Sequence, residues 1–185
     1  MAKTEQRTIS FLTGKARFAL AAMSLMLAFA STPPAVAQQD LNIGRSTGLP
    51  LPRFVSLDQR RPEANIRFGP GRQYPINWVF TRPGVPLKII AEFDNWRKIE
   101  DHEGEQGWIS AQLLSGQRTI MVQGGVRDLK RTADSVGRVI LRAEVGVIGS
   151  LLECQEIWCR VEIEGQRGWL QRGDFWGTLA GELLP

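Results

Sequence analysis

The stretch GVPLKIIAEFDNWRKIEDHEGEQGWI, residues 84–109, returns in altered form as GVIGSLLECQEIWCRVEIEGQRGWL at residues 146–170. Three pairs of anchors stand at an offset of 61 or 62 residues: Gly84 with Gly146, Trp96 with Trp158, and Trp108 with Trp169. Anchors that recur in one order at a nearly constant offset indicate an internal repeat. The chain therefore contains two copies of a unit of about 60 residues, close to the lower size limit for an independent core.

Both copies show the alternation of half-buried strands. Apolar residues occupy every second position, at Val85, Leu87, Ile89, Ala91 and Phe93 in the first copy and at Cys159, Val161 and Ile163 in the second. Period two predicts β-strands, and Gly104 and Gly165 predict hairpin turns between them. One short helical turn is predicted at residues 110–114. Short strands separated by Gly and Pro turns predict an all-β fold, with a small barrel or sandwich in each copy.

The residues around these strands give a family resemblance. In the first copy they are Asn65-Ile66-Arg67, Gly69-Pro70, Tyr74-Pro75, Trp78, Gly84-Val85-Pro86, Trp96-Arg97-Lys98-Ile99 and Gly107-Trp108-Ile109. In the second copy they are Leu129-Lys130, Val139-Ile140, Gly146-Val147, Trp158-Cys159-Arg160-Val161, Gly168-Trp169 and Phe175-Trp176-Gly177. Residues 58–177 thereby resemble bacterial SH3-like domains of a kind common in exported proteobacterial proteins. The resemblance implies two SH3-like β-barrels in tandem, which we place at residues 58–122 and 123–185.

The second copy departs from the first in one loop. It lacks the Gly-Pro-Gly of residues 69–71 and has no counterpart of Tyr74, Pro75 or Trp78. The pattern of Gly-Trp near the end of each copy is specific for the fold and says little about a ligand. The resemblance therefore does not assign one ligand to both copies.

The first 37 residues have the three parts of a secretory signal peptide. A start with four basic residues precedes an uncharged core at residues 18–30, and Ala35-Val36-Ala37 is a small-x-small cleavage pattern. The core is too short to cross a bilayer comfortably as a helix, which disfavours the alternative of a retained anchor. We predict cleavage after Ala37, export to the periplasm and no membrane span afterwards. Residues 38–57 are predicted to be a mostly unstructured linker.

The charge of the chain changes when this segment is removed. Residues 38–185 hold 19 basic and 18 acidic side chains, so the basic excess belongs mostly to the targeting segment. Overall charge therefore gives no argument for a nucleic-acid partner.

Two cysteines, Cys154 and Cys159, flank a short hairpin-like connection. If the strands pair across it, the two side chains lie at disulfide distance, and export favours oxidation. A metal site needs about four ligands and a redox motif is normally C-x-x-C, so a structural disulfide is favoured over both. The repeat offset places Glu92 and Arg97 at the same positions of the first copy, where we predict an ion pair.

Common catalytic motifs, such as the hydrolase elbow, the P-loop, the dinucleotide fingerprint and H-E-x-x-H, do not occur in the sequence. The single histidine, His102, lies in a polar turn and is predicted at the surface. A neighbouring acidic cluster has the composition of a solvated hairpin tip and not the spacing of an EF-hand; its members are Glu100, Asp101, Glu103 and Glu105. We expect no catalytic residue, no metal and no cofactor.

All six tryptophans lie within the two copies. Four of them recur between copies, which favours core or half-core packing, because tryptophan buries a large area. SH3-like folds also bind extended peptides in grooves lined by aromatic side chains. Ligand contacts are therefore predicted, with packing as the alternative, at Arg67, Tyr74, Trp78, Trp96 and Trp108.

These features together predict a non-catalytic periplasmic binding or adaptor protein. Its predicted partner is peptidoglycan, through cell-wall peptides, or a segment of a periplasmic protein. One alternative is an envelope peptidoglycan hydrolase or an accessory subunit of one, which is disfavoured because the chain has no room for an added catalytic domain. The other is a structural envelope factor without a small ligand.

Overall fold

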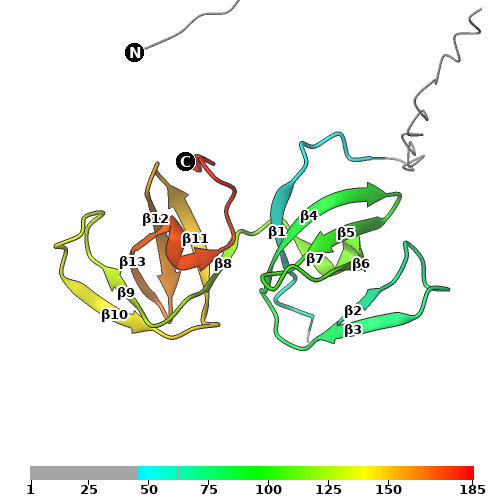
Figure 1. Cartoon of the computed structure of the whole chain (residues 1–185), viewed down its shortest axis with the longest axis horizontal. Helices are drawn as coiled ribbons and strands as arrows, with labels where there is room; N and C mark the ends of the chain where they lie inside the picture. The colour runs from blue at the N-terminus through cyan, green and yellow to red at the C-terminus, as the bar shows by residue number, and fades with distance from the viewer. Residues whose placement is uncertain (1–45, 62) are drawn as a thin grey trace, which may run out of the picture. The chain divides into compact units, whose positions relative to one another are not determined.

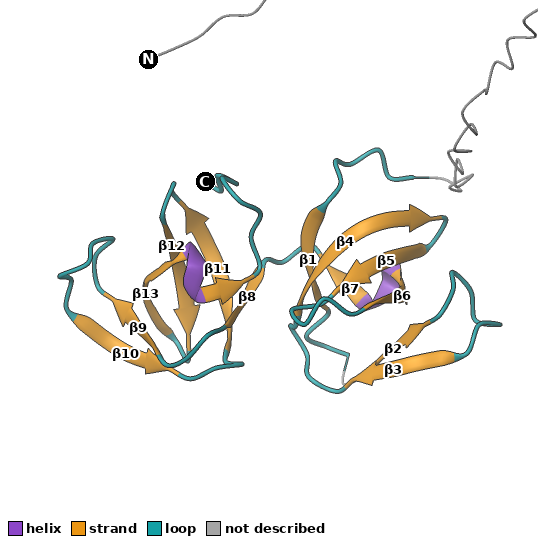
Figure 2. Cartoon of the chain, viewed as in Figure 1, coloured by secondary structure: helices purple, strands orange, loops and turns teal. Residues whose placement is uncertain are grey.

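The computed structural model describes residues 46–61 and 63–185. The predicted signal peptide at residues 1–37 lies outside this part of the chain. The described residues form β-strands and two short 3₁₀ turns, η1 (Ala111–Leu113) and η2 (Arg172–Asp174). The first of these turns confirms the one predicted at residues 110–114. Figures 1 and 2 show the strands gathered into two curled sheets.

The first sheet has seven antiparallel strands in the order β3-β2-β6-β5-β4-β1-β7. Their bounds are β1 (Arg53–Leu57), β2 (Ala64–Arg67), β3 (Ile76–Phe80), β4 (Pro86–Phe93), β5 (Trp96–Glu100), β6 (Gln106–Ser110) and β7 (Leu114–Ser115). Strand β4 is the longest and pairs with both β1 and β5.

The second sheet repeats this order strand by strand, as β10-β9-β13-β12-β11-β8-β14. Its bounds are β8 (Thr119–Val122), β9 (Arg127–Lys130), β10 (Val139–Ala143), β11 (Ile148–Cys154), β12 (Trp158–Ile163), β13 (Gln166–Gln171) and β14 (Phe175–Trp176). The prediction of an all-β chain with two SH3-like domains in tandem is confirmed.

Both sheets begin earlier than the sequence predicts. Residues 53–57, the end of the predicted linker 38–57, form β1 and pair with β4 in the first sheet. Residues 119–122, assigned to the end of the first domain, form β8 and pair with β11 in the second sheet. Each domain therefore begins with a strand, β1 or β8, that pairs with the longest strand of its sheet. Neither β1 nor β8 contains a Gly-Trp or Gly-Val pair by which the sequence could have indicated it.

The core of each domain lies inside the curl of its sheet. Fully buried aliphatic side chains fill the first core, among them Ile66, Leu87, Ile89, Ile99 and Ile109. The second core holds Ile120, Val122, Leu129, Val161 and Leu170, together with both cysteines. The hairpin turns predicted at Gly104 and Gly165 are present, and both glycines have positive φ, which favours glycine.

A β-bulge corrects the predicted alternation in β4. The register with β5 shifts between Ile89 and Ala91, so the side chains beyond this point change faces. Ala91 and Phe93, predicted inside, are only half-buried, whereas Glu92 is 1% exposed. The second sheet has its bulge at the equivalent place, between Leu151 and Glu153, which turns Cys154 inward.

The glycine of each Gly-Trp pair is required by close packing. A Cβ added to Gly107 would collide with the Ile66 side chain and lie 3.1 Å from the Trp78 ring. A Cβ on Gly168 would lie 2.7 Å from both the Leu129 side chain and the Lys130 carbonyl. The close packing of β6 against β2, and of β13 against β9, therefore explains the recurrent Gly-Trp motif better than a ligand does.

Candidate functional site

Trp96 is the first residue of β5 and lies at the centre of a groove in the first domain. It faces Phe93 across the β4–β5 hairpin and Ser110 across to β6. Two neighbouring hollows of about 410 and 500 Å³ adjoin it. Both are lined by Arg72, Trp96, Ser110 and Gln112, so they form one continuous groove, which we call the Trp96 groove.

The two ends of the Trp96 groove differ in charge. Arg61, Asn65 and Arg67 line the first hollow. The loop at residues 70–73 and the hairpin tip at residues 93–95 line the second, where Asp94 is the acid among the described lining residues. The groove thus offers an indole face, several side-chain amides and an excess of guanidinium groups.

Arg67 shapes the groove by holding a loop. Its guanidinium donates hydrogen bonds to the backbone carbonyls of Arg72, at 3.2 Å, and Tyr74, at 2.7 Å. The loop between β2 and β3 is thereby tied to the end of β2. This loop contains the Gly-Pro-Gly that the second copy lacks, so its conformation is particular to the first domain.

The structure brings together two of the five predicted contact residues. Arg67 and Trp96 line the same hollow, whereas Tyr74, Trp78 and Trp108 line neither. Trp78 packs against the first core and meets Phe80 edge to face at 6.0 Å. The Tyr74 ring lies over Gly69, and Trp108 stands opposite Arg67 in the sheet register. Ligand contact at these residues stays a prediction.

Sequence reasoning missed the polar lining of the groove. Arg61 precedes the first strand of the family pattern, and Arg72 follows the Gly-Pro-Gly turn. Ser110 and Gln112 flank the start of the η1 turn. The sequence could have indicated them by position, because polar residues that border a loop or a turn near the recurrent Trp96 are candidates for the wall of a groove.

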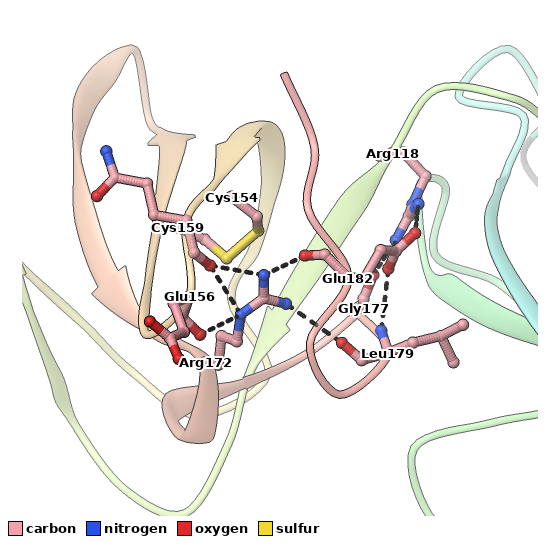
Figure 3. The surroundings of a disulfide bond; sticks show 9 residues. Arg118, Cys154, Glu156, Cys159, Arg172, Gly177, Leu179 and Glu182 are labelled. Carbon is pink, nitrogen blue, oxygen red and sulfur yellow. Dashed lines mark hydrogen bonds and ion pairs between the residues drawn. A yellow bond between two sulfur atoms is a disulfide. The ribbon is translucent and has the colours of Figure 1, made fainter.

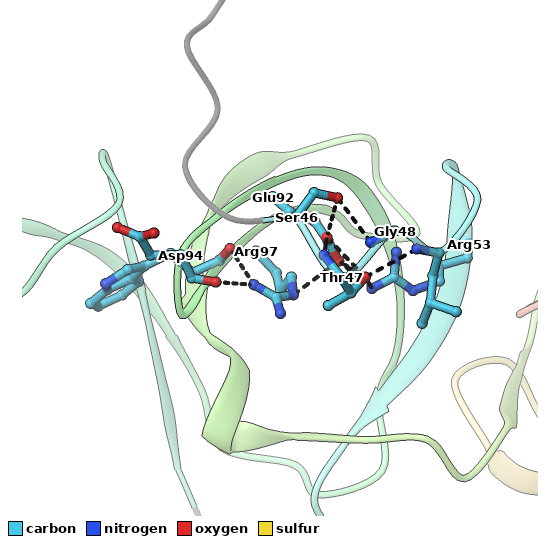
Figure 4. A network of polar contacts seen from close by, with 9 residues as sticks. Ser46, Thr47, Gly48, Arg53, Glu92, Asp94 and Arg97 are labelled. Carbon is cyan, nitrogen blue, oxygen red and sulfur yellow. Dashed lines mark hydrogen bonds and ion pairs between the residues drawn. The ribbon is translucent and has the colours of Figure 1, made fainter.

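A buried charge network fixes the hairpin that carries Trp96. Glu92 has a fully buried side chain and forms ion pairs with Arg97, at 3.1 Å, and with Arg53. Arg97 in turn donates to the carbonyls of Asp94 and Trp96, at 2.8 and 2.9 Å. The predicted ion pair between Glu92 and Arg97 is confirmed, and Figure 4 shows the contacts that run from Thr47 through Glu92 and Arg97 to Asp94.

The same carboxylate holds a segment from the predicted linker. The Thr47 amide donates to Glu92 at 2.6 Å, and the Ser46 hydroxyl donates at 3.0 Å. Burial opposes ionisation of Glu92, but the hydrogen bonds from Arg53, Thr47 and Ser46 outweigh it and lower the pKa to about 2. Residues 46–47 are therefore bound to the first domain and not a free tether (Figure 4).

The second domain fixes the equivalent hairpin covalently. Cys154 and Cys159 stand opposite each other in the register and form a disulfide, as predicted, with their Cα atoms 4.1 Å apart. The tail at residues 179–184 packs beside it, because Cys154 and Leu184 exchange backbone hydrogen bonds. Arg172 lies between the hairpin and the tail (Figure 3). Its guanidinium donates hydrogen bonds to the backbone carbonyls of Gln155, Glu156, Leu179 and Glu182.

The counterpart of Trp96 in the second domain, Trp158, has a cation beside its ring. Lys130 stands opposite Trp169, as Arg67 stands opposite Trp108. Its ammonium lies over the Trp158 ring, 5.8 Å from the centroid, and donates to the Ser135 carbonyl. Lys130 therefore contacts the recurrent tryptophan of the second domain, whereas Arg67 donates its hydrogen bonds to loop carbonyls in the first. Trp96 and Trp158 are both half-buried.

The acidic turn at residues 101–105 is closed by one of its own carboxylates. Asp101 is buried and accepts the amides of Glu103 and Glu105, both at 2.9 Å, which closes the acidic turn. His102 is half-buried in the same turn. Among the described residues, no group of three or more His, Cys, Asp or Glu side chains is placed to hold a metal. No helix in that part of the chain has the length and hydrophobicity to cross a membrane.

Comparison with known proteins supports this architecture. The family model of the bacterial SH3 domain matches residues 60–116 and again residues 129–177. No curated protein sequence matches the chain.

Several solved structures share a likeness at low similarity. NlpC1 and NlpC2 from Trichomonas vaginalis are 9% and 10% identical to the chain, with TM-scores of 0.34 and 0.33. The alignments cover 74% and 69% of this chain and 49% and 48% of those proteins. An NlpC/P60 family protein from Bacillus cereus is 13% identical over 71% of this chain and 58% of its own, with a TM-score of 0.30. The chain thus spans about half the length of these proteins, and likeness at this level carries no functional argument.

Proposed function

We propose that this chain, which belongs to the bacterial SH3 domain family, is an exported, non-catalytic binding protein that attaches to the cell wall through the Trp96 groove. The partner is a cell-wall peptide, and the first domain is the one that binds it. A cell-wall role accords with the family, because SH3-like folds take extended peptides in aromatic grooves.

One observation carries the proposal. Trp96 lines a groove with polar walls in the first domain, whereas in the second domain the Lys130 ammonium lies 5.8 Å from the centroid of the Trp158 ring. An aromatic face bordered by hydrogen-bonding groups is the usual composition of a peptide-binding site. In this proposal the second domain has the same fold but does not bind the cell-wall peptide.

Export is part of the proposal and rests on two features. The first 37 residues have the composition of a signal peptide. Disulfides such as Cys154–Cys159 form and persist in oxidising compartments outside the cytosol. N-terminal sequencing of the protein from the periplasmic fraction is expected to begin at Gln38. A first residue at Met1 would contradict cleavage.

The proposal is tested by retention of residues 38–185, the mature chain, on purified peptidoglycan sacculi. Trp96→Ala is expected to lower retention at least about tenfold, and the matched variant Trp158→Ala is expected to retain the wild-type level. Circular dichroism of both variants checks that they remain folded. Equal losses in the two variants, or no retention of the wild type, would overturn the proposed site.

The same incubation separates binding from hydrolysis. Soluble muropeptides released from the sacculi are measured by chromatography, and none above the buffer control are expected. Release that grows with time and protein concentration would instead establish a hydrolase.

A further inference from the structure

We propose that the Trp96 groove recognises its peptide by a carboxylate, which Arg61 and Arg72 bind while the chain of the peptide lies against Trp96. This inference rests on the proposed function, since it takes the groove to be the binding site. It adds the chemical class of the ligand and the place where its charged group lies.

Arg72 is available for a ligand because of the contacts that Arg67 makes. The Arg67 guanidinium is used by the backbone carbonyls of Arg72 and Tyr74. This fixes the backbone of Arg72 and leaves its side chain exposed on the shared wall of both hollows. Arg72 belongs to none of the ion pairs within 4.0 Å among residues 46–61 and 63–185.

Arg61 is available for a parallel reason. The nearby carboxylate of Asp58 is occupied on both oxygens by Arg60, whose guanidinium lies 2.9 and 3.1 Å away. Arg61 donates its amide to the Asp58 carbonyl at 3.0 Å, and its guanidinium acts on the Asp58 carboxylate through charge without a hydrogen bond to it. Its side chain is exposed and lines the first hollow. Two arginines with no ion-pair partner among the described residues therefore border one hollow.

The rest of the lining favours a peptide over a bare anion. Asn65 and Gln112 present amide groups to the first hollow, and Trp96 presents its ring. Side-chain amides match the donors and acceptors of a peptide backbone, and guanidinium forks match a carboxylate. Asp94 lies in the second hollow, so the carboxylate is directed to the end that holds Arg61.

The experiment compares native sacculi with sacculi whose carboxylates have been converted to methylamides. The mature chain is expected to bind the amidated sacculi at least about tenfold more weakly. Arg61→Gln/Arg72→Gln is expected to bind native sacculi as weakly, with little further loss on amidated sacculi. Arg131→Gln/Arg138→Gln, which removes the same charge from exposed positions of the second domain, is expected to bind as the wild type does.

A peptide titration gives an independent readout. Acetyl-Ala-Ala-Ala with a free carboxylate is expected to shift the Trp96 indole signal in ¹H–¹⁵N spectra, and its C-terminal amide is expected to shift it far less. Equal shifts with both peptides, or no shift with either, would overturn the inference. Equal displacement of the peptide by the same concentration of inorganic phosphate would also overturn it, because the site would then be selective for anions alone.

The outcomes distinguish the two proposals. Suppose that Trp96→Ala loses retention, while Arg61→Gln/Arg72→Gln keeps it and the wild type is also retained on amidated sacculi. This result rejects the carboxylate and keeps the wall-binding groove. Absence of retention on native sacculi rejects wall binding, and the peptide titration then decides the carboxylate inference alone.

Discussion

The two domains fix the same hairpin by different chemistry. In each, a bulge turns one side chain of the long strand inward, and a residue five positions later faces it. The first domain places Glu92 and Arg97 there, and the second places Cys154 and Cys159. A disulfide has no strong hydrogen-bonding capacity, whereas a buried carboxylate needs several donors. The charged version therefore recruits an additional chain segment, residues 46–47, to complete its hydrogen bonds.

The domains also differ in what borders the recurrent tryptophan. In the first domain Arg67 donates to carbonyls of the loop after β2, and Trp96 lines a groove. In the second domain this loop has another sequence, and Lys130 lies over Trp158. One fold thus has a polar groove beside the recurrent tryptophan in one copy and a cation beside it in the other.

Removal of the Glu92 carboxylate is expected to have the largest effect on the first domain. Glu92→Ala leaves Arg53 and Arg97 without their buried partner, and breaking a buried pair costs about 3 kcal/mol. The free energy of unfolding of the mature chain, measured in urea, is expected to fall by this amount. Hydrogen exchange in β4 and β5 should rise with it.

The matched control is Glu153→Ala in the second domain. Glu153 faces Arg160 at 3.9 Å, with the Arg160 side chain 44% and the Glu153 side chain 36% exposed, and pairs near the surface contribute less than about 1 kcal/mol. Equal losses in the two variants would contradict a special role for Glu92.

Acid is expected to weaken the first domain through the same group. The pKa of Glu92 is about 2 in the folded chain and about 4.5 when unperturbed. A depressed carboxyl pKa stabilises fully above the unfolded value, and this stability disappears as the pH falls from about 4.5 to about 2. Unfolding free energy should drop by about 2 kcal/mol from pH 7 to pH 3 through this group alone. Glu92→Gln should lack that part of the dependence, and an unchanged pH profile in the variant would contradict the assignment.

Loss of the disulfide is expected to destabilise the second domain by about 2 kcal/mol, as loop entropy gives for so short a connection. Cys154→Ser/Cys159→Ser is measured in urea beside Glu92→Ala. Hydrogen exchange should rise in β11 and β12 and stay unchanged in β4 and β5. Faster exchange in both sheets would show that the two hairpins are not independent.

The repeat in the sequence was sufficient to predict much of this structure. Matching Trp96 with Trp158 led to the two copies and to the Glu92–Arg97 pair, and the short connection between Cys154 and Cys159 led to the disulfide. The inward direction of Glu92 was not predictable, because the bulge after Ile89 depends on the register with β5 and not on the local alternation. The strand at residues 53–57 was missed because its pairing partner, β4, lies 30 residues away or more.

The groove was only partly predictable for a related reason. Tyr74, Trp78 and Trp108 were predicted from their aromatic character, but none of them lines the groove. Trp78 packs against the first core, whereas the Tyr74 ring lies over Gly69 and is 40% exposed. The polar residues that border Trp96 come from separate loops, and their proximity depends on the folded sheet.

Removal of the cation over Trp158 is expected to have the smallest effect. Lys130→Met keeps most of the side-chain stem and removes the ammonium, and exposed cation–π contacts contribute about 0.5–1 kcal/mol. The unfolding free energy should therefore change by less than about 1 kcal/mol, while the Trp158 indole signal shifts in ¹H–¹⁵N spectra and the Trp96 signal stays in place. A loss as large as that caused by removal of the disulfide would show that Lys130 supports the fold of the second domain. A small loss with a shifted Trp158 signal would show that the ammonium contacts the ring without holding the domain together, so that the two copies differ at this position in the surroundings of the tryptophan and not in the stability of the fold.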